Sequence, residues 1–211
     1  MADLDFGCVG VSADRYSAAP AVTLRMRAVG APDERVHAAA IRCQVRVEPR
    51  RRRYDDEEAA SLTGLFGGRE RWDETMQPLQ LAFLTHLLPG FTGSTDFDLS
   101  LPCSYDFDVA AHRYLDSLED GEVPLILLFS GTVFTGTAGH LQVAPVPWHT
   151  ETRVRLPVAV WREAMDVHFP GQAWLRLSRH NFDRLVAYGN RHQLTGWEDI
   201  VERLLKEAGE E

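Results

Sequence analysis

The stretch that decides the fold is Phe107–Phe134, FDVAAHRYLDSLEDGEVPLILLFSGTVF. Its second half, Val123 to Phe134, is the longest apolar run of the chain and contains no charged residue. The charged segment Glu119–Glu122 precedes this run, and the glycine within it suits a tight turn. An uncharged run that is rich in β-forming residues and bounded by a turn predicts a strand buried on both faces, in the middle of a sheet.

The first half of the stretch, Phe107–Leu118, fits two structures. Adjacent alanines and the i, i+3 spacing of Leu115 and Leu118 fit a helix, whereas alternating apolar residues at its start fit a strand. The long central strand needs a long neighbour. We therefore expect Phe107–Leu118 to be a strand that forms a hairpin with Val123–Phe134.

Alternation of apolar and polar residues predicts further strands that have one solvated face, which is typical of antiparallel sheets. The clearest example is Ile41–Glu48, where four apolar residues alternate with four polar ones. The other strands are expected at Phe6–Val11, Val22–Arg27, Leu79–Leu87, Phe97–Leu101, Leu141–Val146 and Thr152–Leu156.

Helices are expected at Asp55–Leu65 and Val158–His168, and a third is capped by Ser178 or Asn181. A fourth helix starts at Thr195–Glu198, which has the spacing of a capping box. Strands come first and helices last, and no linker separates them. This order predicts a single α+β domain over residues 1–211, mainly an antiparallel sheet with helices packed on one face and helices at the C-terminus.

Composition excludes several classes of function. The net charge of −9 over 211 residues argues against non-specific binding to nucleic acid and to anionic membranes. Four consecutive arginines, Arg50–Arg53, are followed at once by the four acids Asp55–Glu58, which cancel their field. No segment reaches the roughly 18 apolar residues of a membrane helix. The N-terminus has two acids before any apolar run, so we expect a cytoplasmic protein rather than a secreted one.

Motifs of catalysis and metal binding are absent from the sequence. The three cysteines are widely spaced, and the eight histidines form neither an HExxH motif nor a pairing with CxxC. GxSxG and phosphate-binding glycine loops are also missing. We therefore expect a protein that is not an enzyme and that holds no cofactor or metal. The alternative is an enzyme or small-molecule-binding protein with a pocket built from distant residues, for which the candidates are His140, His149, Asp166 and His168.

Large aromatic residues are the remaining candidates for a binding surface, because such residues dominate protein interfaces when they are exposed. Most of the five tryptophans are expected in the core, and Trp148, between a proline and a histidine, is expected at the surface. The candidate partner-binding residues are Trp72, Phe83, Trp148 and Trp161.

Two resemblances bear on function. The segments Glu48–Tyr54 (EPRRRRY), Asp120–Phe134 and Pro145–His149 (PVPWH) resemble an uncharacterised actinobacterial family that is often encoded near genes for nickel–iron hydrogenases. The C-terminal half is similar, more distantly, to the SecB export chaperone. The matching segments, in order, are Phe107–Val109, Asp120–Gly121, Gly131–Phe134, Val158–Pro170, Leu175, Leu177 and Asn181–Asp183.

Together these resemblances imply a non-enzymatic accessory protein that binds other proteins. Such a protein is chaperone-like or scaffold-like, acts in hydrogenase maturation or assembly, and has a hydrogenase subunit or maturation factor as its partner. The SecB resemblance also implies that Phe107–Leu118 is a strand. Self-association into a homo-oligomer and a role as a structural subunit of a larger assembly both stay open.

Overall fold

The computed structural model describes residues 4–104, 106, 109–137, 140–173 and 175–209. The chain divides into two compact units, Met1–Ala173 and Trp174–Glu211. The first unit holds all the strands, and the second holds two helices. The expected α+β class with antiparallel sheets is confirmed.

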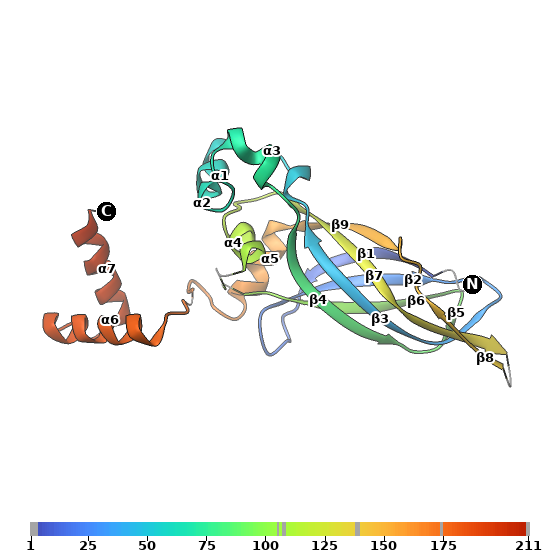
Figure 1. The fold of residues 1–211 in the computed structure, drawn as a ribbon. Helices are drawn as coiled ribbons and strands as arrows, with labels where there is room; N and C mark the ends of the chain where they lie inside the picture. The colour runs from blue at the N-terminus through green and yellow to red at the C-terminus, as the bar shows by residue number, and fades with distance from the viewer. Residues whose placement is uncertain (1–3, 105, 107–108, 138–139, 174, 210–211) are drawn as a thin grey trace. The chain divides into compact units, whose positions relative to one another are not determined.

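The strands of the first unit form two antiparallel sheets (Figure 1). The smaller sheet has the order β1-β2-β6, from Asp5–Ala13, Ala21–Val29 and Ser94–Pro102. The larger sheet has the order β4-β3-β7-β8, from Leu79–Leu88, Arg35–Val47, Glu122–Thr137 and His140–Pro145. Two further strands join the larger sheet: β5 (Phe91–Thr92) pairs with β3, and β9 (Glu151–Pro157) pairs with β7.

Strand β7 is the central strand that the uncharged run predicted. It pairs with β3 along one edge, and with β9 and then β8 along the other. Only one of its faces is buried, through residues such as Leu125, Leu127 and Phe129. The other face, which carries Ile126 and Leu128, is partly exposed. The expected burial on both faces was therefore wrong, because side chains such as Ile126 and Leu128 on the second face stay partly accessible to solvent.

The core lies between the two sheets. Phe6 of β1 stacks on Phe129 of β7 with ring centroids 4.2 Å apart, and it meets Phe97 of β6 edge-on at 6.1 Å. The Thr152 hydroxyl of β9 donates a hydrogen bond to the carbonyl of Phe6, which ties the sheets together at this edge. The alternating strands thus turn their apolar faces inward to one shared core.

Residues Ala110–Asp116 form helix α4, so the expected strand and hairpin were wrong. Phe107 and Asp108 lie outside the described residues. The helix buries Ala111, Tyr114 and Leu115, and the edge of β7 that the hairpin would have filled is taken by its other partners. Long-range packing has overridden an ambiguous local pattern here. The hairpin that the SecB resemblance implied is not formed.

Short helices interrupt the strand order between β3 and β4. They are the 3₁₀ turns η1 (Pro49–Arg51) and η2 (Arg69–Arg71) and the helices α1 (Asp56–Ser61), α2 (Thr63–Phe66) and α3 (Trp72–Thr75). The helix expected at Asp55–Leu65 is therefore split at Leu62, although Asp55 does cap it by accepting from the Glu58 amide at 2.9 Å. Helix α5 (Val158–Asp166) follows β9 directly, as expected. In Figure 1, α1–α5 lie at the same end of the strands.

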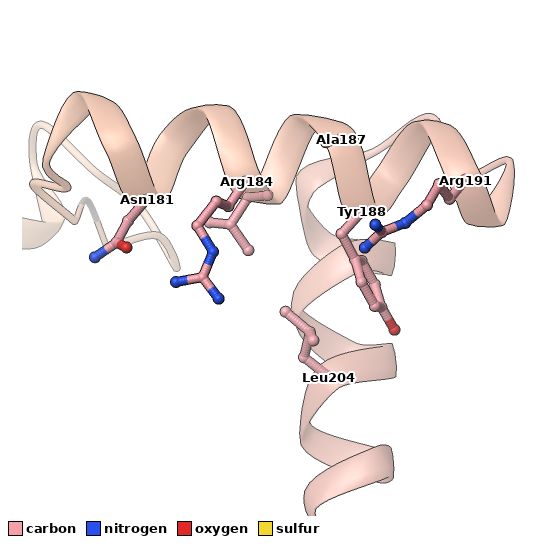
Figure 2. A pocket seen from close by; sticks show the side chains of 7 residues that line it. Asn181, Arg184, Ala187, Tyr188, Arg191 and Leu204 are labelled. Atoms are coloured by element: carbon pink, nitrogen blue, oxygen red, sulfur yellow. The ribbon is translucent and has the colours of Figure 1, made fainter.

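The second unit contains helices α6 (Arg179–His192) and α7 (Trp197–Ala208). Ser178 caps α6, as one of the two expected residues, by accepting from the Asn181 amide at 3.3 Å. The expected capping box of α7 is wrong, because Gly196 is its N-cap and no side chain caps it. The two helices meet closely at Gly189, where an added Cβ would lie 2.6 Å from Ile200. Figure 2 shows the cleft between them, about 520 Å³ in volume.

Candidate functional site

The outer face of the larger sheet is the main candidate for a functional surface. Residues directly opposite each other in antiparallel strands point to the same side of a sheet. Leu87 of β4 lies opposite Ala40 of β3. Ala40 lies opposite Thr132 of β7 on its other side, and Thr132 lies opposite Pro145 of β8. This row crosses all four strands on the solvent side.

Four large apolar side chains stand exposed on this face, and we call them the outer-face patch. They are Phe83, Leu87, Leu141 and Val143, with exposed fractions between 60% and 68%. Ala38 and Ala40 of β3 and Leu128 and Phe134 of β7 lie between them, half-buried or exposed. Thr85 and the opposite Arg42 separate Phe83 from Leu87, whereas the other apolar residues adjoin one another across the four strands. Solvated sheet faces are normally polar, and apolar surface of this kind marks an interaction site in soluble proteins.

A β-bulge explains how Phe83 and Leu87 come to face solvent. The odd-numbered apolar residues of β4 appear in the sequence to share one face, yet Leu81 is buried and Phe83 is exposed. The register of β3 and β4 shifts between Val45 and Arg46, so that Leu81 is the extra residue of β4. A bulge reverses the inward and outward alternation beyond it.

Strand β8 adds a free edge beside the patch. Among the described residues it pairs only with the far half of β7, and β9 pairs with the near half. The corner between β8 and β9 carries Trp148, which is 93% exposed. An edge strand presents unpaired backbone donors and acceptors, so an extended segment of another protein has a template here.

The four predicted partner-binding residues do not gather in one place. Phe83 belongs to the outer-face patch and Trp148 to the neighbouring corner. Trp72 is half-buried, donates from its indole nitrogen to the Gly67 carbonyl at 3.0 Å and packs edge-on against a tyrosine. Trp161 is a residue of α5 and its side chain is buried in the core, out of reach of a partner. Of the two remaining tryptophans, Trp197 is 51% exposed and Trp174 lies outside the described residues.

Sequence reasoning missed three members of the patch, Leu87, Leu141 and Val143. For Leu141 and Val143 the sequence did contain a hint of exposure. The alternation of apolar and polar residues in β8 is too weak to assign either face of the strand to the core. For Leu87 no local signal existed, since its orientation depends on a bulge set by pairing with β3.

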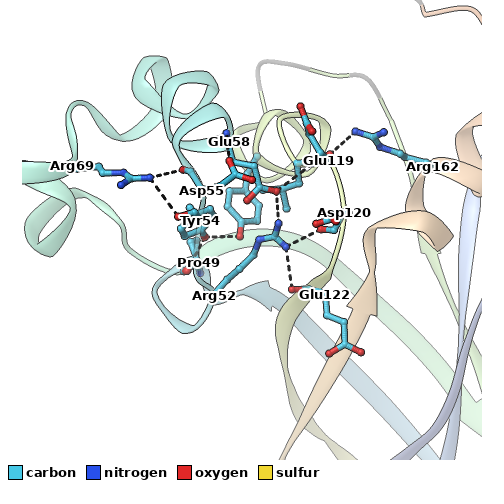
Figure 3. A network of polar contacts seen from close by, with 12 residues as sticks. Pro49, Arg52, Tyr54, Asp55, Glu58, Arg69, Glu119, Asp120, Glu122 and Arg162 are labelled. Carbon is cyan, nitrogen blue, oxygen red and sulfur yellow. Dashed lines mark hydrogen bonds and ion pairs between the residues drawn. The ribbon is translucent and has the colours of Figure 1, made fainter.

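A buried polar network lies at the helical end of the first unit (Figure 3). The Arg52 guanidinium forms an ion pair with Glu58, and the two side chains are only 8% and 3% exposed. Arg52 also donates to the Asp120 carbonyl at 3.0 Å, and the Glu58 carboxylate accepts from the Glu119 amide at 3.2 Å. The network therefore joins α1 to the turn before β7.

Two tyrosines extend this network. Tyr54 donates its hydroxyl proton to the Pro49 carbonyl at 2.7 Å, so the Tyr114 hydroxyl donates to Tyr54 at 2.6 Å. Burial raises the pKa of Tyr54 to about 12, and burial also raises the pKa of Tyr114. Both stay neutral at physiological pH, so neither supplies a phenolate nucleophile.

The alternative pocket does not form as a cluster. Asp166 and His168 lie at the end of α5, whereas His140 is on β8 and His149 is in the corner after it. His168 makes contacts with the carbonyls of Ser17 and Ala164 at 3.0 and 3.3 Å. Over the described part of the chain, no three His, Cys, Asp or Glu side chains are placed to hold a metal ion.

The cysteines provide a direct test of the core. Burial raises the pKa of Cys43 and Cys103 to about 12, and only the thiolate form reacts. At pH 8 we expect both to react with a thiol reagent at least about a hundredfold more slowly than the same thiols in denaturant. Cys8 is partly exposed and is expected to react before either of them. Mass spectrometry of the native protein over time checks the order, and rapid labelling of Cys43 would contradict the burial of β3.

The whole sequence matches the model of one protein family. Residues 1–211 match the family described as "Family of unknown function (DUF6084)". The chain belongs to this family. No curated protein matches the sequence significantly. Among solved structures, 74% of this chain is similar to a β-glucosidase from Kluyveromyces marxianus, with a TM-score of 0.28 and 11% identity. The chain spans 15% of that enzyme, and a likeness this weak carries no argument about the family.

Within the part of this family member that the structure describes, no helix is both long and apolar enough to cross a membrane.

Proposed function

We propose that this protein is a non-enzymatic accessory protein that binds an extended apolar segment of another protein. The observation that carries the proposal is the outer-face patch, with its four large apolar side chains on one solvated sheet face. The adjacent free edge of β8 supports an extended ligand in particular, because backbone pairing there is independent of the ligand's sequence. Both features suit a chaperone-like or scaffold-like protein that accepts unfolded or newly made chains.

The setting we propose is the maturation or assembly of a nickel–iron hydrogenase, with a hydrogenase subunit or maturation factor as the partner. The support is the resemblance of Glu48–Tyr54, Asp120–Phe134 and Pro145–His149 to a family often encoded near hydrogenase genes. The patch fits that setting, because proteins that have not finished folding or assembling transiently expose apolar surface.

A client-aggregation assay tests the binding surface. The full chain is expected to slow the aggregation of reduced α-lactalbumin, followed by light scattering. Replacing both Phe83 and Leu87 by serine removes apolar contact area and is expected to raise the concentration needed for half-protection about tenfold or more. Both side chains are exposed already, so the fold should persist with little change in its thermal midpoint.

The matched control is Tyr16→Ser, which removes a side chain that is 99% exposed on the loop between β1 and β2, outside the outer-face patch. It should protect the client as well as the native protein does. Equal protection by the native chain and by the Phe83 and Leu87 variant would overturn the assignment of the patch. A pull-down of hydrogenase subunits with the same variants tests the setting separately.

A further inference from the structure

The outer face of the larger sheet carries a group of arginines beside the outer-face patch. They are Arg42 and Arg46 of β3 and Arg153 and Arg155 of β9, and we call them the outer-face arginines. All four alternate with buried residues along their strands, so their side chains lie on the same side of the sheet as the patch. Among the described residues, Arg153 forms an exposed ion pair with Glu151 at 3.0 Å, and the other three have no ionic partner.

These arginines adjoin the apolar residues of the same face. Arg42 lies in the row between the rows of Phe83 and Leu87. Arg46 and Arg153 stand on either side of a half-buried β7 residue, in one row that crosses three strands. A ligand that covers the outer-face patch therefore meets guanidinium groups as well as apolar side chains.

The smaller sheet pairs the arginines of its own solvated face within the protein. Arg25 of β2 lies opposite Asp98 of β6, and Arg27 lies opposite Asp96. The ion-pair distances between the guanidinium nitrogen and carboxylate oxygen are 3.5 and 2.6 Å. The outer-face arginines lie opposite uncharged residues of the neighbouring strands instead. The chain itself therefore does not supply the carboxylates that would pair with them across the larger sheet.

The charge of the larger sheet is opposite in sign to that of the whole protein. As the structure describes them, its six strands contain five arginines, namely Arg35 and the outer-face arginines, and two acids, Glu122 and Glu151. The whole chain has 31 acids against 22 lysines and arginines. A short bound segment responds to charges within about a Debye length, ~8 Å, and so to this local positive field.

We propose that the segment bound on the outer face is acidic as well as apolar, with glutamate or aspartate side chains that pair with Arg42 and Arg46. This proposal rests on the function proposed above and names the chemistry of the same partner. Four residues of a β-strand span about 13 Å, so two carboxylates four residues apart in an extended segment match the spacing of the two arginines. Guanidinium groups suit carboxylates because the two groups form parallel pairs of hydrogen bonds.

Two other anionic partners fit this face less well. Nucleic acid is held mainly through its phosphates, and such contacts leave the aliphatic side chains of the outer-face patch uncovered. An anionic membrane responds to the charge of the whole surface, and the net charge of −9 opposes that attraction. The free edge of β8 beside the patch favours a polypeptide, because it offers hydrogen bonds to a peptide backbone.

Binding of three synthetic peptides to the full chain tests the proposal. Each peptide has about twelve residues and the same apolar residues in one half. In the other half, two positions four apart are both glutamate, both glutamine or both lysine. Fluorescence anisotropy at about 50 mM salt should give the glutamate peptide a Kd at least about tenfold lower than that of the glutamine peptide, and the lysine peptide the highest Kd. Salt at about 500 mM should shrink the difference several-fold, because exposed charges are screened.

Substitution of the two arginines assigns the preference to this face. Arg42→Gln with Arg46→Gln should reduce the preference for glutamate over glutamine to about threefold or less, with little change for the glutamine peptide. Arg42→Glu with Arg46→Glu should reverse the order, so that the lysine peptide binds most tightly. The matched control is Arg25→Gln with Arg27→Gln, which removes the same charge from the smaller sheet and should keep the native preference. Far-ultraviolet circular dichroism checks that each variant is folded.

Equal affinities for the three peptides, all weakened by serine at Phe83 and Leu87, would overturn this inference and leave the proposed function standing. An unchanged preference in the Arg42 and Arg46 variants would overturn it as well, because acidic segments would then bind elsewhere. So would tighter binding of phosphatidylglycerol vesicles or of a single-stranded oligonucleotide than of the glutamate peptide. If no peptide binds at about 1 mM, this inference is overturned, and the client-aggregation assay decides the proposed function separately.

Discussion

Replacement of Gly131 by alanine is expected to destabilise the protein by about 3 kcal/mol or more. Gly131 lies in the middle of β7 with φ of +144°, a conformation that residues with a Cβ rarely adopt. An added Cβ would sit 2.1 Å from the Ala40 carbonyl oxygen and 3.0 Å from the Ile41 Cα. Both contacts are with the backbone of β3, which cannot move without breaking the longest pairing in the sheet.

Chemical denaturation followed by tryptophan fluorescence measures the effect. The matched control is Gly7→Ala on β1, where an added Cβ meets nothing within 4 Å. The control should leave the unfolding free energy within about 1 kcal/mol of the native value. If the Gly131 and Gly7 variants unfold at the same denaturant concentration, the close approach of β7 and β3 is wrong.

Neutralising Glu58 is expected to cost about 3–5 kcal/mol of stability. Glu58→Gln keeps the shape of the side chain but leaves the Arg52 guanidinium as an uncompensated buried charge. The Nε atom of Arg52 is already buried without a hydrogen-bond partner in the described residues, so the remaining contacts with carbonyls near Asp120 cannot offset the loss. Thermal and urea unfolding of the single variant give the free energy.

A pair on the same helix provides the control. Asp56 is 97% exposed and lies 3.0 Å from Arg69, so Asp56→Asn should change stability by less than about 1 kcal/mol. Replacing both Arg52 and Glu58 by leucine should recover much of the loss, because a buried pair replaced by apolar residues leaves no unpaired charge. A double variant less stable than Glu58→Gln would show that Arg52 stabilises the turn before β7 independently of Glu58.

The strands were largely predictable from the sequence because each leaves a local pattern. Alternation at Ile41–Glu48 and at Phe97–Leu101 reflects one buried and one solvated face, and such alternation does not depend on which strand lies alongside. The split of the helix expected at Asp55–Leu65, and the short turns after it, were not predictable in this way. Helices of four to six residues carry too little periodicity to be separated from one longer helix.

The candidate site was predicted only in part. Exposure of Phe83 and Trp148 fits their choice as partner-binding residues, but the sequence put Trp161 in the same group although it fills the core. A tryptophan on an amphipathic helix has the same local signature whether it meets a partner or the protein's own sheet. In the sequence, Arg52 and Glu58 stood out only as members of a run whose charges cancel, because the burial of the pair depends on a turn more than sixty residues away.

By itself, the sequence determined that Val123–Phe134 is a long central strand, because an uncharged β-forming run of this length has few other stable structures in a soluble protein. Only the tertiary structure decided what lies beside it. The residues before the turn form α4 because Tyr114 and Leu115 reach the core from a helix, while β3 supplies the partner that β7 requires. Which face of that strand meets solvent was also decided by packing, since burial depends on the layers above a sheet and not on the strand's own residues.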